Sequence, residues 1–189
     1  MVIGNCILRQ VIALTMFAPL ACFGTPVYAG AEAGAGHGSP KKAKPTRFQV
    51  RRVLKLEQPL RHGDYVWRPE GAPKGRITIA ADLKAETLSV FRGGYEIGVA
   101  AILYGVPSHP TPLGSFQILQ KDADHKSNIY HAPMPYMLRL TNDGVAIHGS
   151  KVSWGTASHG CIGVPVEFAK LLFAQAKLGD SVIITRYKN

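Results

Sequence analysis

The chain has 189 residues, of which 46% are hydrophobic and 18% charged, and its formal net charge is +10 at pH 7. This length suits one domain with a real core and excludes a second large domain. The positive charge predicts contact with something anionic. The basic residues follow no recognition-helix, zinc-finger or RNA-binding pattern, so we expect no nucleic-acid partner. We interpret the basic run KKAKPTRFQVRR as a solvated segment.

Residues 1–29 predict a secretory signal. One early charge, Arg9, precedes an apolar stretch over residues 11–23, and Val27-Tyr28-Ala29 has the small, any, small form of a signal-peptidase site. The stretch is too short and too weakly flanked for a membrane span. We therefore expect an exported protein, periplasmic or associated with the cell wall, with no stable membrane anchor after cleavage. Cleavage would lower the net charge to +9, because Arg9 is the only charged residue removed.

The remaining chain divides into a linker and one domain. Residues 30–46 are mainly Gly, Ala, Pro and Lys with almost nothing to bury, which indicates a flexible linker. We expect the domain to cover residues 47–189. Short runs typical of strands lie at 77–79, 88–91, 97–104, 114–118, 136–140, 145–148 and 181–185. This pattern predicts a mostly β fold, a sandwich or barrel, with one main helix over residues 165–179.

Cleavage of the signal would leave Cys161 as the only cysteine, since Cys6 and Cys22 lie in the removed segment. A lipid anchor on Cys22 is an alternative, although Pro19 stands where an aliphatic residue would be wanted. An unpaired cysteine in an exported protein indicates intermolecular pairing, a metal site or a reactive nucleophile. A small buried hydrophobe is the ordinary alternative, and the polar neighbours in SHGCIGV argue against it.

The surroundings of Cys161 predict a nucleophile for acyl transfer. The residue is expected just ahead of a helix N-terminus, where the helix dipole favours a thiolate, and His148 and His159 are candidate bases. Gly160 and Gly163 would free backbone N–H groups to receive the oxyanion of a tetrahedral intermediate. Zinc bound by the two histidines and the cysteine is the alternative. A structural zinc site wants four ligands, however, and no other cysteine remains, so we expect no metal.

Three segments resemble the L,D-transpeptidase catalytic domain family, also called YkuD. AIHGSKVSWGTASHGCIGV resembles the signature in which a strand ending in His-Gly is followed by a loop and Ser/Thr-His-Gly-Cys. HPTPLGSFQI is similar to the Thr-Pro-x-Gly-x-Phe strand of the family, and APMPYMLRLTNDGVAIHG to its Pro-Met-Pro-Tyr approach to the catalytic histidine. Together they cover roughly residues 76–185.

The resemblance implies a β-rich fold with neither metal nor organic cofactor, and it implies roles for individual residues. Cys161 would be the nucleophile and His148 its activating base, with the imidazole oriented by the carbonyl of Gly149. Tyr136 would flank the substrate groove. The loop and the oxyanion hole would be shaped by Ser158, His159 and Gly160.

The resemblance also implies a reaction. Such enzymes cut the bond before the terminal D-alanine of a peptidoglycan tetrapeptide stem and hold the acyl group as a thioester. They then pass the acyl group to an amine on another stem, to water or to a free D-amino acid. Peptidoglycan stem peptides are therefore the expected partners, and we expect a monomer.

Two departures from the pattern bear on the substrate and the acceptor. Gly163 stands where the family usually carries arginine or asparagine, and His148 lies only 13 residues before Cys161. The glycine predicts a wider and less positive site, with Lys151 as the nearest replacement charge. A non-catalytic peptidoglycan-binding protein that keeps the fold is the alternative function. A papain-like peptidase fits badly, because there the cysteine precedes its histidine.

Overall fold

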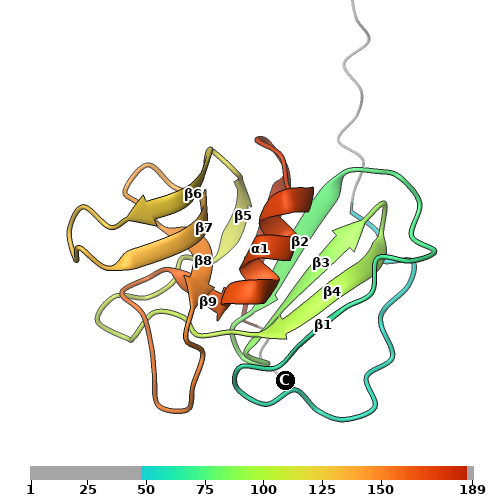
Figure 1. The fold of residues 1–189 in the computed structure, drawn as a ribbon, viewed down its shortest axis with the longest axis horizontal. Coiled ribbons are helices and arrows are strands. Elements are labelled where there is room, and N and C mark those ends of the chain that lie inside the picture. Colours follow the sequence, from blue (N-terminus) through green and yellow to red (C-terminus); the bar gives the residue numbers. More distant parts are fainter. Residues whose placement is uncertain (1–47, 187–189) are drawn as a thin grey trace, which may run out of the picture. The chain divides into compact units, whose positions relative to one another are not determined.

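The computed structural model describes residues 48–186, so the predicted signal over 1–29 and linker over 30–46 lie outside it. Within this range the chain forms two β-sheets and one helix (Figure 1). The strands are β1 (Tyr65–Trp67), β2 (Ile77–Asp82), β3 (Thr87–Arg92), β4 (Tyr95–Ala101), β5 (Gly114–Gln117), β6 (Gln120–Lys126), β7 (Pro133–Arg139), β8 (Ala146–Ser150), β9 (Ile162–Pro165) and β10 (Ser181–Thr185). The helix is α1 (Val166–Gln175).

The larger sheet has six strands in the order β1-β4-β3-β2-β10-β5. Its pairings are antiparallel except for β10, which lies parallel to β2 with Ser181 opposite Thr78. Residues of β2 alternate between buried and half-buried, as expected for a strand with one face on a core. The tight turn between β3 and β4 uses Gly93 and Gly94, both with positive φ, as a two-residue hairpin of this kind requires.

The smaller sheet has four strands in the order β6-β7-β8-β9, and it carries the two site motifs. Strands β8 and β9 pair in parallel, with Ile147 opposite Ile162 and His148 opposite Gly163. Parallel neighbours need a crossing connection, which here is the loop from 151 to 161. This register brings Cys161, just before β9, beside the start of β8.

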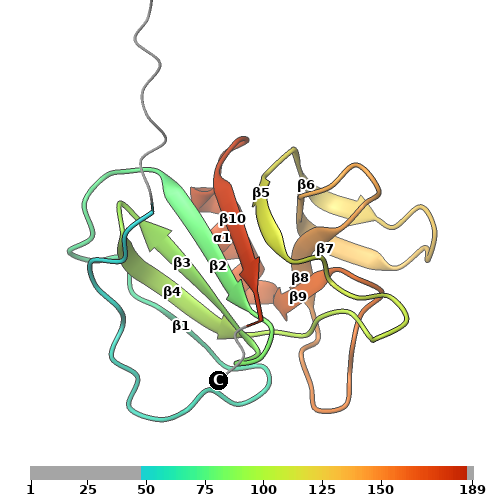
Figure 2. The same cartoon turned by 180° about the vertical axis from the view of Figure 1, so that it is seen from behind.

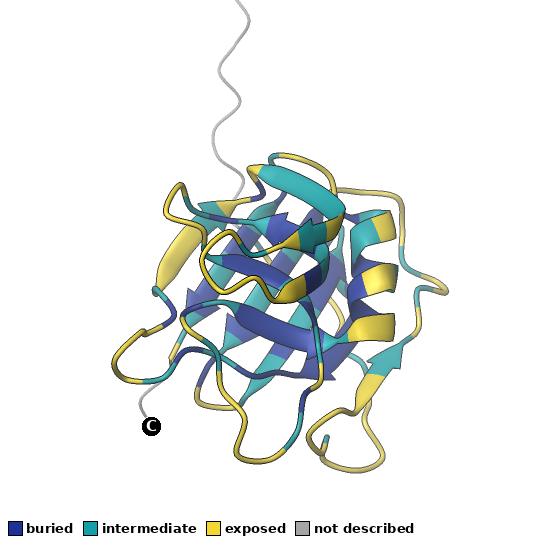
Figure 3. Cartoon of the chain, turned by 60° about the vertical axis from the view of Figure 1, so that its left-hand side comes forward, coloured by how far each residue is buried: buried dark blue, intermediate teal, exposed yellow. Residues whose placement is uncertain are grey.

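Helix α1 lies between the two sheets, as both views of the ribbon show (Figures 1 and 2). Its inner side carries Phe168, Ala169 and Leu172, which are at most 2% exposed and belong to one core shared by both sheets. Figure 3 shows the outer side of α1 exposed and the strands behind it buried. The predicted mostly β fold with one main helix is therefore confirmed. In residues 48–186 no helix is long and apolar enough to cross a membrane.

The helix is shorter than its sequence pattern predicted. Residues 162–165 continue the sheet as β9, and Pro165 is still extended, with ψ at 138°. At the other end Ala176 is extended, and the backbone N–H of Lys177 donates to the Asp180 carboxylate at 2.8 Å in a closing turn. Strand pairing thus overrides the local helix signal at Pro165, and the closing turn ends the helix early at the other end, because tertiary contacts outweigh intrinsic propensity.

Candidate active site

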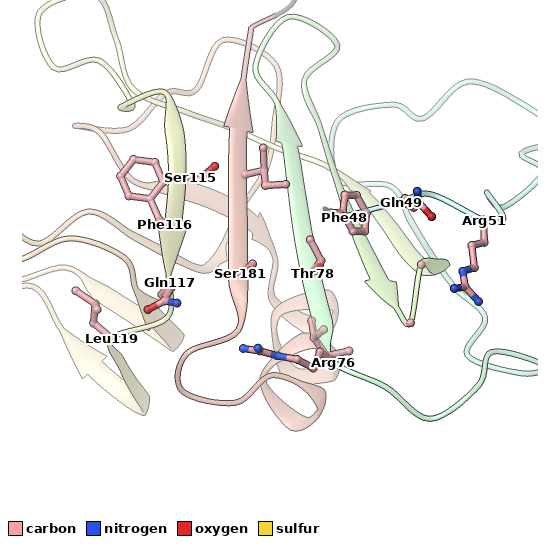
Figure 4. A pocket seen from close by; sticks show the side chains of 14 residues that line it. Phe48, Gln49, Arg51, Arg76, Thr78, Ser115, Phe116, Gln117, Leu119 and Ser181 are labelled. Atoms are coloured by element: carbon pink, nitrogen blue, oxygen red, sulfur yellow. The ribbon is translucent and has the colours of Figure 1, made fainter. Parts of the chain in front are cut away.

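The predicted catalytic residues meet in a cleft of about 1000 Å³ on the smaller sheet. Its lining includes six of the predicted site residues: His148, Lys151, Ser158, His159, Gly160 and Cys161. A second groove, of about 930 Å³, lies over β2, β10 and β5 of the larger sheet and holds none of the predicted site residues. Figure 4 shows Thr78, Ser181 and Gln117 side by side in that groove. Cys161 and His148, the predicted nucleophile and base, belong to the first cleft.

Alternation along β8 aims His148 into the cleft. Ala146, His148 and Ser150 line the cleft, whereas Ile147 between them is 1% exposed and packs in the main core. A one-residue slip would turn the imidazole to the other face of the sheet. The apolar partner of Ile147 across the ladder, Ile162, is 0% exposed, and burial of this pair holds the register.

The imidazole of His148 is held in a form that can accept a proton. Its Nδ1 lies 3.0 Å from the carbonyl oxygen of Gly149, which can only accept, so Nδ1 carries the hydrogen and Nε2 presents its lone pair. Burial lowers the pKa of His148 below its ordinary 6.5, the Gly149 carbonyl opposes this shift, and the charge of His125 adds to it. His148 is therefore a neutral base at pH 7.

Cys161 is held as a neutral thiol. Burial raises its pKa above the ordinary 9.0, and a contact with the backbone N–H of Ala146 only partly offsets the rise. The thiol points toward the turn after β7 and donates to the carbonyl of Gly144, with Sγ to O at 3.8 Å. The predicted stabilisation of a thiolate by the helix dipole is wrong, because β9 separates Cys161 from the first turn of α1 and the dipole acts only close to that turn.

The loop before Cys161 is hydrogen-bonded to the segment from 103 to 106. The N–H of Ser158 donates to the carbonyl of Tyr104 at 2.9 Å, and the N–H of Val106 donates to the carbonyl of Ser158 at 3.1 Å. The hydroxyl of Ser158 donates to the carbonyl of Cys161 itself. Backbone hydrogen bonds therefore hold this loop against the 103–106 segment, and the Ser158 hydroxyl adds a hydrogen bond within the loop.

A buried threonine that we did not single out from the sequence adds to these hydrogen bonds. Thr111, 5% exposed, accepts from the N–H of Gly105 at 2.9 Å and donates to the carbonyl of Gly160 at 3.0 Å. Gly160 has φ of +107°, a conformation that favours glycine, and it directly precedes Cys161. The signal was present in the sequence, since Thr111 is the threonine of the HPTPLGSFQI segment.

His159 lies in the wall of the cleft. Its ring stacks on Tyr130, with centroids 4.6 Å apart and planes at 27°, and meets His109 edge-on at 5.1 Å. In residues 48–186 it forms no hydrogen bond with Cys161 or His148. These contacts place His159 as an aromatic surface that shapes the cleft.

The structure places Tyr136 and Gly163 outside the cleft. Tyr136 packs on the main core and on Phe173 of α1, with centroids 5.9 Å apart. Its neighbour Met137 faces the cleft instead, because successive residues of a strand point to opposite faces. The same period-2 pattern in the sequence could have located Tyr136 on the core side.

The predicted widening at Gly163 is wrong. A Cβ at this position would lie 2.7 Å from the side chain of Leu103 and 2.9 Å from the Cβ of Ser150, so Leu103 already fills the space. The backbones of Leu103 and Gly163 also exchange two hydrogen bonds of 2.9 Å. Glycine is needed here for this close approach.

The cleft carries cationic side chains from two different elements. Lys151 lies exposed in the loop after β8, and Arg139 lies half-buried at the end of β7. Asp143 is the carboxylate of the cleft lining. Among residues 48–186, the histidine, cysteine, aspartate and glutamate side chains form no group of three that could hold a metal ion.

Comparison with known proteins agrees with this geometry. The family described as "L,D-transpeptidase catalytic domain" (YkuD) matches residues 76–184, more than half of the chain. The chain belongs to the L,D-transpeptidase catalytic domain family. The matched range contains the smaller sheet that carries the cleft, together with His148 and Cys161.

The sequence is moderately similar to individual members of the L,D-transpeptidase family. L,D-transpeptidase 1 of Mycobacterium tuberculosis is 29% identical over 131 residues, which cover 60% of this chain and 52% of that protein. The probable L,D-transpeptidase 3 of the same species is 28% identical over 106 residues, 47% of this chain and 39% of that protein. The chain thus spans about half the length, or less, of these relatives.

Solved L,D-transpeptidase structures share the fold. One from Stackebrandtia nassauensis has a TM-score of 0.55 and 26% identity, covering 61% of this chain and 58% of that chain. The transpeptidase LdtMt1 in complex with imipenem has a TM-score of 0.54 and 26% identity, covering 58% of this chain and 59% of that chain. The predicted fold class is therefore confirmed against experimental structures.

Proposed function

We propose that this protein is a peptidoglycan L,D-transpeptidase that uses Cys161 as nucleophile and His148 as base. One observation carries the proposal. The two side chains line the same cleft, His148 from β8 and Cys161 from the residue just before β9, and the Gly149 carbonyl holds Nδ1 so that Nε2 is free to take the thiol proton. Family membership supports the reaction class.

In the first half-reaction the Cys161 sulfur attacks the carbonyl carbon before the terminal D-alanine of a tetrapeptide stem. His148 Nε2 accepts the thiol proton as the C–S bond forms, so the neutral pair becomes imidazolium and a tetrahedral oxyanion. The backbone N–H groups beside Gly160 and Cys161 are candidates to stabilise that oxyanion. When the C–N bond breaks, the imidazolium returns its proton to the leaving amine, and a thioester remains.

In the second half-reaction an amine of another stem attacks the thioester carbonyl. His148 takes a proton from the attacking amine and gives it to the departing sulfur, which restores the thiol and leaves a new amide. Water in place of the amine would give hydrolysis. The neutral resting pair suits this cycle, because the base must be unprotonated at the start of each half-reaction.

The proposed site of action is outside the cytoplasmic membrane. The predicted signal over residues 1–29 supports export, and the substrate of the family lies outside the cytoplasm. A periplasmic or wall-associated monomer, free of the membrane after cleavage, fits this proposal.

A digest tests the function directly. Purified protein is incubated with tetrapeptide muropeptides, and the products are resolved by mass. Cross-linked dimers with loss of D-alanine are expected, together with a covalent adduct at Cys161 after exposure to a carbapenem. Binding of the muropeptides with neither product nor adduct would favour the alternative, a non-catalytic wall-binding protein.

A further inference from the structure

Arg139 lines the cleft, and its side chain has a hydrogen-bond donor without a partner among the described residues. Its Nε is buried and, within residues 48–186, has no hydrogen-bond partner. The ion pairs in the same range join His62 to Glu86, Arg76 to Asp180 and His125 to Asp122, so none of them engages Arg139. A buried donor without a partner destabilises the folded protein, because its hydrogen bond to water is lost and not replaced. A ligand that accepted this hydrogen bond would relieve that destabilisation.

The sheet connects Arg139 to the segment that contacts the thiol of Cys161. It is paired with Ala146 in the β7–β8 register, and Ala146 contacts the thiol of Cys161 through its backbone N–H. Side chains directly opposite one another in such a ladder have Cβ atoms about 4.5–5.5 Å apart. The side chain of Arg139 therefore begins opposite Ala146, the residue whose backbone N–H contacts the thiol.

The other features of the cleft are less suited than Arg139 to bind an anionic group of a ligand. Gly163 has no side chain, and Leu103 occupies the space where one would project. Lys151 is exposed in a loop, where solvent and salt screen its charge. A half-buried guanidinium is screened less, and its planar set of donors matches a carboxylate at two points.

We propose that Arg139 binds a carboxylate of the acyl donor and orients the donor toward Cys161. This inference rests on the proposed function and names the group that the site recognises. The carboxylate is either the terminal one beside the scissile bond or a side-chain carboxylate of the stem. In both cases the contact forms in the ground state and in the transition state, so its loss raises KM more than it lowers kcat.

The test measures binding without turnover. Calorimetric titration of Cys161→Ala uses the tetrapeptide stem in three forms: unmodified, amidated at its terminus and amidated at its side-chain carboxylate. One of the two amidations is expected to weaken binding about 10- to 100-fold, the range for a hydrogen bond to a charged group. In Cys161→Ala/Arg139→Gln the unmodified stem is expected to bind as weakly as that amidated form, and the amidation is expected to have no further effect.

Two controls separate a specific contact from general damage. Arg139→Lys keeps the positive charge but loses the planar set of donors. It is therefore expected to recover part of the preference for the unmodified stem over the amidated one. Lys151→Gln removes the exposed cation and is expected to leave the preference unchanged. Equal weakening of all three stems by Arg139→Gln, or loss of the preference with Lys151→Gln instead, would overturn the inference. Undetectable binding of the unmodified stem to Cys161→Ala would overturn it as well.

Turnover by the otherwise wild-type protein separates this inference from the proposed function. If Arg139 controls carboxylate preference but no cross-linked product or carbapenem adduct forms, the transpeptidase proposal fails and the Arg139 inference stands. If products form and the preference does not depend on Arg139, the transpeptidase proposal stands and the Arg139 inference fails.

Discussion

The hydroxyl of Thr111 donates to the carbonyl of Gly160 across 3.0 Å, and this carbonyl belongs to the peptide bond that carries the N–H of Cys161. Because a peptide unit is planar and trans, fixing the oxygen also fixes the direction of the N–H on its other side. Thr111 thus positions the backbone N–H of Cys161, the proposed nucleophile.

Substitution of Thr111 tests this relationship. Thr111→Val removes the donor to Gly160 and the acceptor for Gly105, so acylation by a carbapenem is expected to slow by about 10- to 1000-fold, as for a weakened oxyanion donor. Alkylation of Cys161 by iodoacetamide forms no oxyanion and is expected to keep its rate. Thr111→Ser should restore most of the acylation rate. Thr185→Val, a change in the larger sheet, is the control, and equal slowing of both reactions by Thr111→Val would indicate general loosening instead.

We expect Cys161 and His148 to make separable contributions to the proposed reaction. Cys161→Ser is expected to abolish the thioester seen by intact mass. His148→Ala is expected to slow acylation roughly 10²- to 10⁴-fold, the usual contribution of a general base. His62→Ala, outside the cleft, serves as the matched control and should leave the rate unchanged. Near-normal transfer by Cys161→Ala would contradict the mechanism.

The pH dependence follows from the two shifted groups. His148 must be neutral to accept the proton, and its pKa is lowered below 6.5, so acylation is expected to be level near pH 7 and to fall only below pH 6.5. The pKa of Cys161 is raised above 9.0, so alkylation should increase only in alkaline solution. Stopped-flow acylation measures the fall in acid and iodoacetamide alkylation measures the rise in alkali, both from pH 5 to pH 10. Fast alkylation that persists into acid would instead indicate a thiolate–imidazolium pair.

Replacement of Gly163 should destabilise the fold rather than extend the site. In Gly163→Asn the new Cβ meets the side chain of Leu103 at 2.7 Å, and overpacking of this kind costs about 1–3 kcal/mol. Chemical denaturation should show that loss. Leu103→Ala removes the side chain in the way, so the double variant should lose less than the sum of the single variants. Additive losses would mean that Leu103 is not the obstacle.

Export is tested by the processed N-terminus. The Val27-Tyr28-Ala29 site predicts a secreted form that begins at Gly30. N-terminal sequencing of protein recovered from the extracytoplasmic fraction should therefore read GAEAG. A form that retains Met1 would contradict the prediction, and a lipid-modified Cys22 would support the alternative anchor.

The sequence by itself determined the mostly β class, the helix and the identity of the motif carrying Cys161 and His148. These features depend on local periodicity and on residues close together in the chain, which a linear pattern records directly. The helix ends were less accurate, because the β8–β9 ladder includes Pro165 and the chain leaves the helix after Gln175, although the predicted helix ran over 165–179.

Only the tertiary structure decided which side chains share the cleft and in what charge state. Tyr136 turned out to face α1, and Leu103, 60 residues before Gly163, closes the space beside that glycine. Arg139 and Thr111 became visible only through contacts made across the two sheets. The pKa shifts of Cys161 and His148 likewise come mainly from burial, which depends on the folded structure and not on the neighbouring residues in the sequence.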